Sequence, residues 1–290
     1  MDISFILVNY KRPDLIFDCI SSIKQFTKQN IFEIIVVDNS SEDVLKKNLR
    51  SFRDVIYIDS KENLGFGKAN NLGVSFAKGK YIYLLNSDTL LLNDSAKILF
   101  DYHEMVGNVG ILCGNLYDIN HMPNHTYGMV LPSLFSIFIY RFHLINFLPG
   151  LNERFNITKC SKKVKQIVGA NMFLRRDLFN SIAGFDSNIF MYVEDTDLSI
   201  RVSKLGLDLI NIPEAKIIHL QGASSLNSNS ILNEINSYIY FFSKHKSLLY
   251  TKFYIILEIV NVVLKKTVFS LRGSDRYRFV LPVLFRKLFN

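Results

Sequence analysis

The sequence predicts an α/β fold in which a mainly parallel central sheet is flanked by helices and followed by a helical C-terminal extension. Strand-like and helix-like segments alternate over the first hundred residues. The strand-like segments are continuous apolar runs, as in strands that are covered on both faces. The residues after about 227 are helical in pattern and basic. We therefore expect a large domain at 1–226, with halves at 1–106 and 107–226, and an extension at 227–290.

Four apolar runs predict the strands of the first half, at 3–8, 32–38, 55–59 and 80–86. A helix at 13–27 begins at Pro13, where the missing N–H loses no hydrogen bond. A polar turn that can act as a cap precedes a helix at about 42–52, and a glycine-punctuated turn and helix occupy 63–79.

The regular alternation of strand-like and helix-like segments ends in the second half. Residues 109–119 predict one or two strands, and 120–165 predict irregular structure that includes a strongly aromatic patch at 131–150. A strand, a helix and a glycine stop follow over 164–185. The helix expected at 194–206 has acids in its first turn and Gly206 at its C-cap. Two short strands are expected after it, at 207–213 and 215–220.

Composition narrows the class of protein. Nearly half of the 290 residues are hydrophobic, which excludes global disorder. A net charge of +8 indicates an anionic partner, which can be nucleic acid, a phosphorylated substrate or an acidic membrane surface. Three scattered cysteines argue against a disulfide framework and a zinc knuckle, and fit a reducing cytoplasm. The N-terminus lacks the basic and long apolar stretches of a signal peptide.

Polar residues follow several predicted strands, where open α/β sheets bind their ligands. Asn9 and Tyr10 end the first strand, Asp38 ends the second, and Asn86-Ser87-Asp88 end the fourth. The first strand is not followed by G-x-G-x-x-G, and the chain has no P-loop motif. These absences leave a nucleotide site in which acidic residues, and not a glycine-rich loop, bind the ligand.

Asp88 is a natural anchor for a metal ion. An acid beside a diphosphate is repelled unless a cation lies between them, and hard divalent cations take carboxylate and phosphate oxygens together. The alternative is that Asp88 caps the helix after residue 93 or closes a turn.

Seven motifs in order resemble the family 2 glycosyltransferases of the GT-A fold, and within them the bacterial rhamnosyltransferase-like group. They cover roughly residues 2–226 and read "ILVNY", "IIVVDNSSED", "NLGFGKANNLG", "LLNSDT", "VGANMFLRR", "FMYVEDTDLSIRV" and "HLQGAS".

The resemblance implies a set of residues around a nucleotide sugar. In this set, Asp38 would bind the pyrimidine base, and Asp88 with His219 would hold Mn²⁺ or Mg²⁺. Asn86 departs from the family by standing where the first acid of a DXD motif is expected, and Arg175 or Arg176 would meet phosphate. The expected donor-binding residues are Val8, Asn9, Tyr10, Asp38, Asn63, Gly65, Lys68, Asn86, Ser87, Asp88, Gly169, Ala170 and Asn171.

Each of these roles has a structural alternative. Asp38 can be the N-cap of the next helix, Lys68 a solvated helix charge and His219 a satisfied structural histidine. Arg175 and Arg176 can be a solvated helix start.

Glu194, Asp195 and Asp197 share one helical turn, so mutual repulsion is expected to raise the pKa of at least one of them. A carboxylate with a raised pKa suits proton abstraction from a sugar hydroxyl. The family motif implies Asp195 as the base, with Glu194 second. The alternative is that these acids only favour the helix N-terminus, with Asp197 paired to Arg201.

The resemblance implies an inverting transferase that uses dTDP-L-rhamnose or, second, a UDP-sugar such as UDP-galactofuranose, UDP-GlcNAc, UDP-glucose or UDP-galactose. The acceptor would be a glycan or lipid-linked saccharide in bacterial surface polysaccharide synthesis, such as O-antigen or capsule. A rival hypothesis is a degenerate protein that only binds nucleotide or glycan. Asn86 favours this rival, whereas the Glu194-Asp195 pair and His219 disfavour it. No motif supports nucleic-acid binding.

The tail predicts membrane contact without a span. Residues 247–264 are apolar but contain Lys252 and Glu258, and the polar stripe Tyr254, Glu258, Asn261, Lys265 follows one helix face. From 265 to 290 there are seven Lys and Arg and one acid. We expect peripheral binding to an anionic membrane surface at the inner face of the plasma membrane, or helices that cover the large domain.

Overall fold

A computed structural model describes residues 1–40, 45, 49, 52, 54–142, 144, 159–220, 228–270 and 280–289, without the side chains of 228, 229 and 268–270. Most of the helix expected at about 42–52 and most of 143–158 lie outside these residues. The chain divides into two compact units. The first contains 1–129, 153–187 and 194–221, and the second contains 130–152, 188–193 and 222–290. The boundary expected at 226 remains a prediction.

One mixed sheet organises the first unit. Its order is β3-β2-β1-β4-β10-β6-β11-β5, with β8 beside β11. Neighbours from β3 to β4 run parallel, as do β6 and β11, whereas β10 is antiparallel to both of its neighbours. The bounds are β1 (Ile3–Asn9), β2 (Phe32–Asp38), β3 (Val55–Asp59), β4 (Tyr81–Asn86), β5 (Thr89–Leu91), β6 (Val109–Tyr117), β8 (Lys162–Lys163), β10 (Asn171–Arg175) and β11 (Asp208–His219). A separate pair joins β7 (Tyr127–Gly128) and β9 (Gln166–Ile167).

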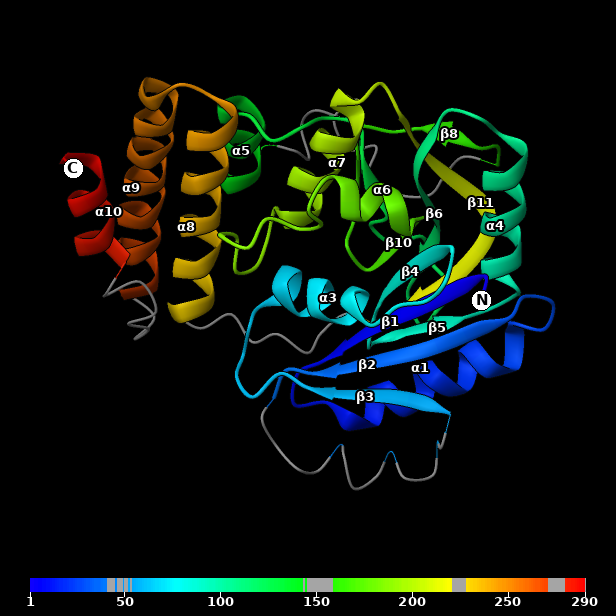
Figure 1. The fold of residues 1–290 in the computed structure, drawn as a ribbon. Coiled ribbons are helices and arrows are strands. Elements are labelled where there is room, and N and C mark those ends of the chain that lie inside the picture. The colour runs from blue at the N-terminus through cyan, green and yellow to red at the C-terminus, as the bar shows by residue number, and fades with distance from the viewer. Residues whose placement is uncertain are drawn as a thin grey trace. The chain divides into compact units, whose positions relative to one another are not determined.

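Helices cover both faces of this sheet (Figure 1). Side chains alternate along each strand, so Phe5 and Leu7 pack on the face with α1 and α4, whereas Ile6 packs on the face with α3, α6 and α7. The bounds are α1 (Pro13–Phe26), α3 (Phe66–Ser75), α4 (Ser95–Met105), α6 (Arg176–Ser181) and α7 (Glu194–Lys204). The predicted strands and helices of the first half are confirmed wherever the structure describes them.

Strand β11 corrects a sequence expectation. Two short strands were expected, but one continuous strand pairs with β6 and carries an irregularity between Ile212 and Lys216. The partners Gly114 and Asn115 are adjacent on β6, while Pro213, Glu214 and Ala215 separate their partners on β11. Proline lacks a backbone donor, so it interrupts the ladder without ending the strand.

The second unit is a helical assembly of α5 (Leu134–Arg141), α8 (Ser228–His245), α9 (Leu248–Ser270) and α10 (Val280–Phe289). Part of the aromatic patch, expected to be irregular, is the helix α5, because Ser133 and Ser136 form a reciprocal capping box. Helices α8, α9 and α10 share an apolar core that includes Ile235, Val262 and Leu284.

Helix α9 turns its polar stripe inward. Glu258 is buried and accepts from Arg141 Nε at 2.8 Å and from Asn261 at 3.0 Å, and Arg141 also pairs with Glu234. The exposed large side chains of α9 are consequently mostly apolar and include Leu249, Phe253, Ile256, Val260 and Val263. None of the described helices is both long and apolar enough to cross a bilayer.

Candidate functional site

Polar residues at the carboxyl ends of neighbouring parallel strands meet at one edge of the sheet. Asn9 of β1 is the partner of Asp38 of β2, and Val8 is the partner of Asn86 at the end of β4. The Asn86 N–H donates to the Ala170 carbonyl at 3.1 Å, which brings the segment before β10 to the same edge. Tyr10, the next residue along the chain from Asn9, is exposed.

Asp38 is buried with donors on both carboxylate oxygens. Oδ1 accepts from Asn9 Nδ2 at 3.1 Å and from the Ser40 hydroxyl and N–H at 2.5 and 3.1 Å. Oδ2 accepts from the Tyr57 hydroxyl at 3.1 Å. Because a carboxylate oxygen has two lone pairs, Oδ2 retains capacity for a further donor.

Asn39 organises the turn that leads into α3, a role that the sequence prediction missed. Its Nδ2 donates to Asn63 Oδ1 at 3.0 Å and to the Gly65 carbonyl at 3.2 Å, and its Oδ1 accepts from the Leu64 N–H at 2.8 Å. Gly65 takes a φ of 80°, which favours glycine. The polar run after β2 was a signal for such a role, because Asn side chains commonly bond nearby backbone groups.

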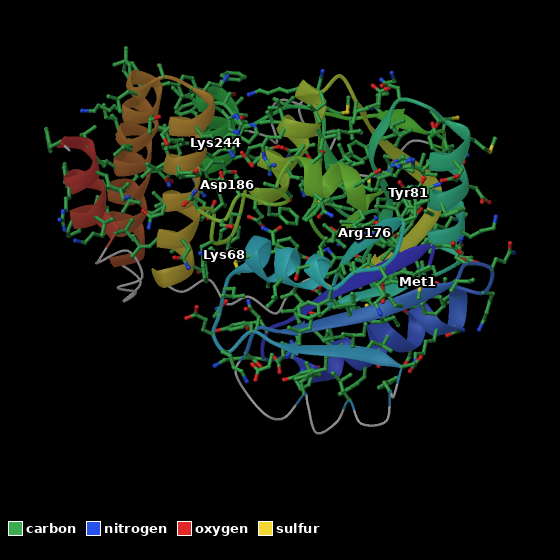
Figure 2. All side chains as sticks on the ribbon, viewed as in Figure 1. Met1, Lys68, Tyr81, Arg176, Asp186 and Lys244 are labelled. Atoms are coloured by element: carbon green, nitrogen blue, oxygen red, sulfur yellow. The ribbon has the colours of Figure 1, made fainter. Side chains whose placement is uncertain are left out.

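The first turn of α3 links this turn to the predicted acids. A Cβ on Gly169 would lie 2.9 Å from the Phe66 ring and 3.5 Å from Cβ of Asp195, and a Cβ on Gly67 would lie 3.8 Å from Cβ of Glu194. Lys68 is exposed on the same helix, at the end of the unit away from Met1 and Tyr81 (Figure 2). The glycines therefore permit a close approach of α3, the 169–170 segment and α7.

Asp88 and His219 face each other. His219 Nε2 lies 3.2 Å from Asp88 Oδ1 and 3.3 Å from Asn86 Nδ2, and His219 is the register partner of Thr89 on β5. The expected alternative that Asp88 caps the next helix is wrong, because Asp94 caps α4 by accepting from the Lys97 N–H.

The donor chemistry of this pair fits a divalent cation. A carboxylate oxygen and an imidazole nitrogen lie together, with the Asn86 amide beside them. Hard cations often take only one or two protein carboxylates and leave the other positions to water and substrate phosphates. Within the described part of the chain, no group of three or more His, Cys, Asp or Glu residues could hold a metal. Water molecules and substrate oxygens would complete the coordination.

Glu194 is buried, Asp195 beside it is half-buried, and the two acids have unequal hydrogen-bond partners. Asp195 accepts from the Gly169 N–H at 2.9 Å, the Thr196 N–H at 2.6 Å and the Thr196 hydroxyl at 3.2 Å. Glu194 Oε2 has no hydrogen-bond partner among the residues that the structure describes. Burial, and then the neighbouring Asp195 charge, raise the pKa of Glu194 to about 8. Burial also raises the pKa of Asp195, although its donors oppose the shift. Glu194 is thus the member that keeps a proton at neutral pH.

Residues 4–182 match the model of glycosyl transferase family 2, which is more than half of the chain. The chain belongs to this family. It is therefore a glycosyltransferase, as the sequence motifs predicted.

Similar proteins agree with the assignment. The rhamnosyltransferase WbbL of Escherichia coli strain K12 is 30% identical over 203 residues, which cover 65% of this chain and 72% of that protein. The dTDP-rhamnosyl transferase RfbF of Shigella flexneri is 24% identical over 221 residues, covering 74% and 68%. A crystal structure of GalNAc-T7 with UDP, GalNAc and Mn²⁺ superposes with a TM-score of 0.61 at 14% identity, over 82% of this chain and 47% of that one. This likeness confirms the GT-A fold.

One acid of the family motif has a structural partner. Asp197 is fully buried and accepts from Arg201 Nε at 2.7 Å, while the other guanidinium nitrogens donate to the Ile182 and Gly184 carbonyls at 2.8 and 2.6 Å. The expected alternative of an Asp197–Arg201 pair is therefore confirmed for this residue.

Three residues of the "VGANMFLRR" motif have their polar groups engaged within the first unit. Asn171 is buried, where its amide accepts from the Tyr83 hydroxyl and donates to the Gly114 carbonyl, each at 2.9 Å. Arg175 is the partner of Tyr81 at the start of β4, and Arg176 donates to the Gly79 and Ala77 carbonyls. The phosphate contact expected of these arginines is wrong, because β10 runs antiparallel to β4 and carries them to the opposite edge.

Proposed function

We propose that this glycosyltransferase is a metal-dependent inverting enzyme that moves L-rhamnose from dTDP-L-rhamnose to a hydroxyl of a glycan or lipid-linked saccharide. The observation that carries the proposal is a continuous series of contacts. It runs from Asp195 to Gly169, through Ala170 to Asn86, and on to His219 and Asp88. A base and an anchor for the diphosphate would thereby share one sheet edge.

The residues at the ends of β1 and β2 would hold the nucleoside. Asp38 Oδ2 would accept from the N–H of the pyrimidine ring, with its geometry fixed by Asn9, Ser40 and Tyr57. The start of α3 has no side-chain cap, so its first N–H groups and Lys68 would favour an anion there. The diphosphate would lie between this helix end and Asp88.

Asp88 and His219, with Asn86 beside them, would hold the cation, and a bound Mn²⁺ or Mg²⁺ would neutralise charge on the departing diphosphate. The roles of Asp88 and His219 as ligands are consistent with their 3.2 Å separation. Asn86 would contribute its amide oxygen after rotation of the side chain, because an amide nitrogen carries hydrogens and cannot act as a ligand.

Asp195 would take the proton of the acceptor hydroxyl while Glu194 stays protonated beside it. The N–H groups of Gly169 and Thr196 that donate to Asp195 keep its carboxylate ionised in preference to its neighbour. The acceptor oxygen would bond to the anomeric carbon as the bond from that carbon to the diphosphate oxygen breaks on the opposite face. Configuration would invert, and the diphosphate would leave with the electron pair.

Rhamnose is favoured because two similar proteins are rhamnosyltransferases by name. A UDP-sugar is the second candidate, since the solved structure with this fold holds UDP. The proposed setting is bacterial surface polysaccharide synthesis, as the sequence resemblance implies.

We also propose that the second unit binds an anionic membrane surface, where a lipid-linked acceptor would lie. Helix α9 exposes Phe253 by 52% and Val260 by 47%, although such side chains are ordinarily covered. Cationic residues flank this face at Lys252 and Lys266, so apolar insertion and charge attraction would act together.

The test of the transferase proposal compares dTDP-L-rhamnose with UDP-sugars, each with Mn²⁺ and with a chelator. We expect dTDP-L-rhamnose to give the largest metal-dependent rise in melting temperature, because bound donor stabilises the folded state by mass action. With a lipid-linked saccharide acceptor, NMR of the product should show an inverted anomeric centre. A retained configuration, or no metal-dependent turnover with any nucleotide sugar, would refute the proposed mechanism.

A further inference from the structure

A pocket lies at the opposite edge of the sheet from the strand-end acids. Its volume is about 630 Å³, and it is lined by residues at the start of β4, the end of α4 and the junction of β10 with α6. Tyr81 and Asn86 are the first and last of the six residues of β4, which separates the two edges by roughly 17 Å at about 3.3 Å per residue. The pocket is thus distinct from the proposed donor site, and its size is that of many small-molecule sites.

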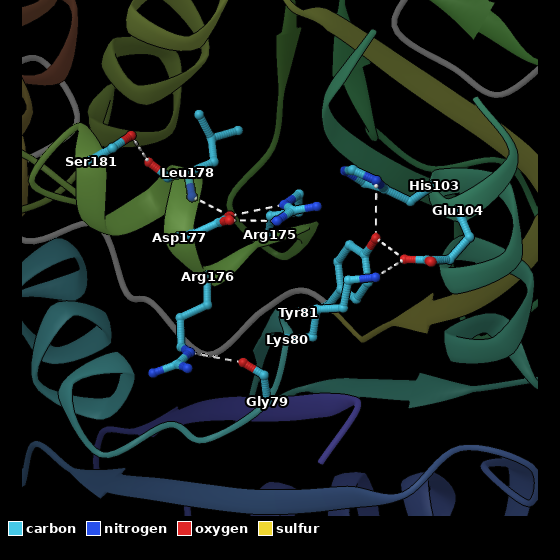
Figure 3. Close-up of polar contacts among 10 residues, drawn as sticks. All are labelled: Gly79, Lys80, Tyr81, His103, Glu104, Arg175, Arg176, Asp177, Leu178 and Ser181. Atoms are coloured by element: carbon cyan, nitrogen blue, oxygen red, sulfur yellow. Dashed lines mark hydrogen bonds and ion pairs between the residues drawn. The ribbon is translucent and has the colours of Figure 1, made fainter. Parts of the chain in front are cut away.

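His103 at this pocket has a nitrogen without a partner. Its side chain is more than nine-tenths buried, and Nε2 makes no hydrogen bond to any residue that the structure describes. Nδ1 lies 3.3 Å from the Tyr81 hydroxyl. Figure 3 shows Nδ1 at that hydroxyl and the other nitrogen turned toward the Arg175 side of the pocket.

The hydrogen bonds around Tyr81 determine the tautomer of His103. The single hydroxyl proton of Tyr81 is donated to Glu104, so the hydroxyl oxygen can only accept from His103. Neutral His103 must therefore carry its proton on Nδ1, and Nε2 presents a bare lone pair. Burial lowers the pKa of His103, with Arg175 and Lys80 acting in the same direction and Glu104 opposing them, so the neutral form is retained. The pocket consequently offers a buried acceptor that lacks a donor.

The charged groups around the pocket balance and are already paired. Lys80 bonds Glu104 at 2.5 Å, and Arg175 bonds Asp177 through two contacts. Two cations and two anions give no net attraction for a phosphate or a nucleotide. Their remaining lone pairs and N–H groups can still bond hydroxyls, which both donate and accept. A neutral ligand rich in hydroxyl groups matches this lining, since one hydroxyl can donate to Nε2 while apolar ring faces pack on Leu178 and Leu207.

We propose that this pocket is a non-catalytic binding site for a neutral saccharide unit, with a sugar hydroxyl donating to His103 Nε2. The site would hold part of a glycan away from the place of transfer. It does not depend on the proposed donor site, so either can fail alone.

NMR with ¹³C-labelled histidine can observe the pocket directly, because the chain has only six histidines and His103→Phe identifies the relevant signal. The probes are methyl α-L-rhamnoside and the methyl β-glycoside of N-acetylglucosamine, with inorganic phosphate as the anionic comparison. At the binding efficiency per atom that is usual for small ligands, a monosaccharide should bind with a dissociation constant of about a millimolar. We expect at least one glycoside to shift the His103 signal saturably, and phosphate to leave it unchanged.

Two matched variants test the location of binding by saturation transfer to the sugar protons. A Cβ on Gly107, which lines the pocket, would meet nothing within 4 Å, so Gly107→Trp can fill the mouth without strain. Met105→Trp places the same ring at an exposed position of α4 outside the pocket. Binding should weaken at least about tenfold, or about 1.4 kcal/mol, in Gly107→Trp and in His103→Phe, and persist in Met105→Trp.

The proposal is overturned if neither glycoside shifts the His103 signal, if phosphate shifts it more strongly, or if Gly107→Trp binds as the parent does. Glycoside shifts confined to His219 would also overturn it, because they would assign the sugar to the strand-end edge.

Discussion

His219 Nε2 lies 3.2 Å from Asp88 Oδ1 although the two residues belong to different parts of the sheet. The contact depends on the antiparallel pairing of β11 with β5, in which His219 stands opposite Thr89. The Leu220 N–H also donates to the Asp88 carbonyl at 2.9 Å, so the backbone fixes both ends of the pair. A rigid pair of this kind suits a ligand set that must be ready before the substrate arrives.

Asp88→Asn and His219→Phe should each abolish most of the metal-dependent part of nucleotide binding. We expect the stabilisation of the protein by dTDP in Mn²⁺ to fall to the level seen with a chelator, because one of the two ligands is lost. Thermal unfolding with and without Mn²⁺ measures this directly. Asp94→Asn is the control, since it removes a nearby carboxylate and Asn caps a helix as well as Asp. A full metal effect in both variants would place the cation elsewhere.

Asp195→Asn should lower the rate of transfer by roughly 10²–10⁴-fold, the usual contribution of a positioned base. Nucleotide affinity should change little, because Asp195 would meet the acceptor and not the nucleoside. Single-turnover rates and dTDP binding separate the two effects. In Glu194→Gln the rate should fall much less. The reverse order of effects would identify Glu194 as the base.

Glu194→Gln should also change how stability depends on pH. The folded pKa of Glu194 is about 8 and its ordinary value is 4.5. Between these values the folded state keeps a proton that the unfolded state has released, so the free energy of unfolding falls as pH rises through this window. Urea unfolding at several pH values should show this fall in the parent protein and a flatter profile in Glu194→Gln. An equal slope in both proteins would contradict the assignment of the proton to Glu194.

Asp197→Asn should destabilise the protein by about 3 kcal/mol, since it leaves the Arg201 guanidinium without its buried counter-charge. The comparable exposed pair is Arg175 with Asp177, where Asp177→Asn should cost about 1 kcal/mol or less. Urea unfolding of both variants checks the contrast. If Asp197→Asn unfolds like the parent but loses transfer, Asp197 belongs to the catalytic machinery.

Phe253→Glu with Val260→Glu should reduce binding to phosphatidylglycerol vesicles by at least about tenfold, because each apolar side chain contributes about 1.5–3 kcal/mol when buried. Vesicle flotation of the full chain measures it. Ile119→Glu is the control, since Ile119 is also an exposed apolar residue but lies in the first unit. Equal flotation of all three proteins would exclude α9 as the membrane contact.

Much of the fold was predictable because local signals agreed with it. Apolar runs gave β1, β2, β3 and β4 to within about a residue, since buried parallel strands need continuous apolar sequence. Gly184 and Gly206 both take positive φ after α6 and α7, so the predicted glycine stops are confirmed. The Asp88–His219 pair was expected only through resemblance to the family, because no local pattern shows which strand will lie beside residue 88.

Other features depended on tertiary structure. The direction of β10 decides that Arg175 lies far from Asn86, and a single sequence does not state strand direction. Helix α9 turns its polar side chains inward because Arg141 of α5 supplies a buried counter-charge for Glu258. This pairing joins segments that are distant in the sequence. His103 gave no sequence signal, because its free nitrogen follows from how Tyr81 shares one proton with Glu104.

The three extra residues in β11 set which way the end of that strand faces. Ile210 and Ile212 pack with α1 and α4, and beyond the irregularity the odd-numbered Ala215 and Ile217 take over that face. Because three is an odd number, the side chains beyond the irregularity alternate in the opposite phase. His219 follows this new phase. A deletion of Glu214 that made the strand end slide by one residue along β6 and β5 would turn the imidazole to the other side of the sheet, separating it from Asp88 while leaving every residue of the pair in place.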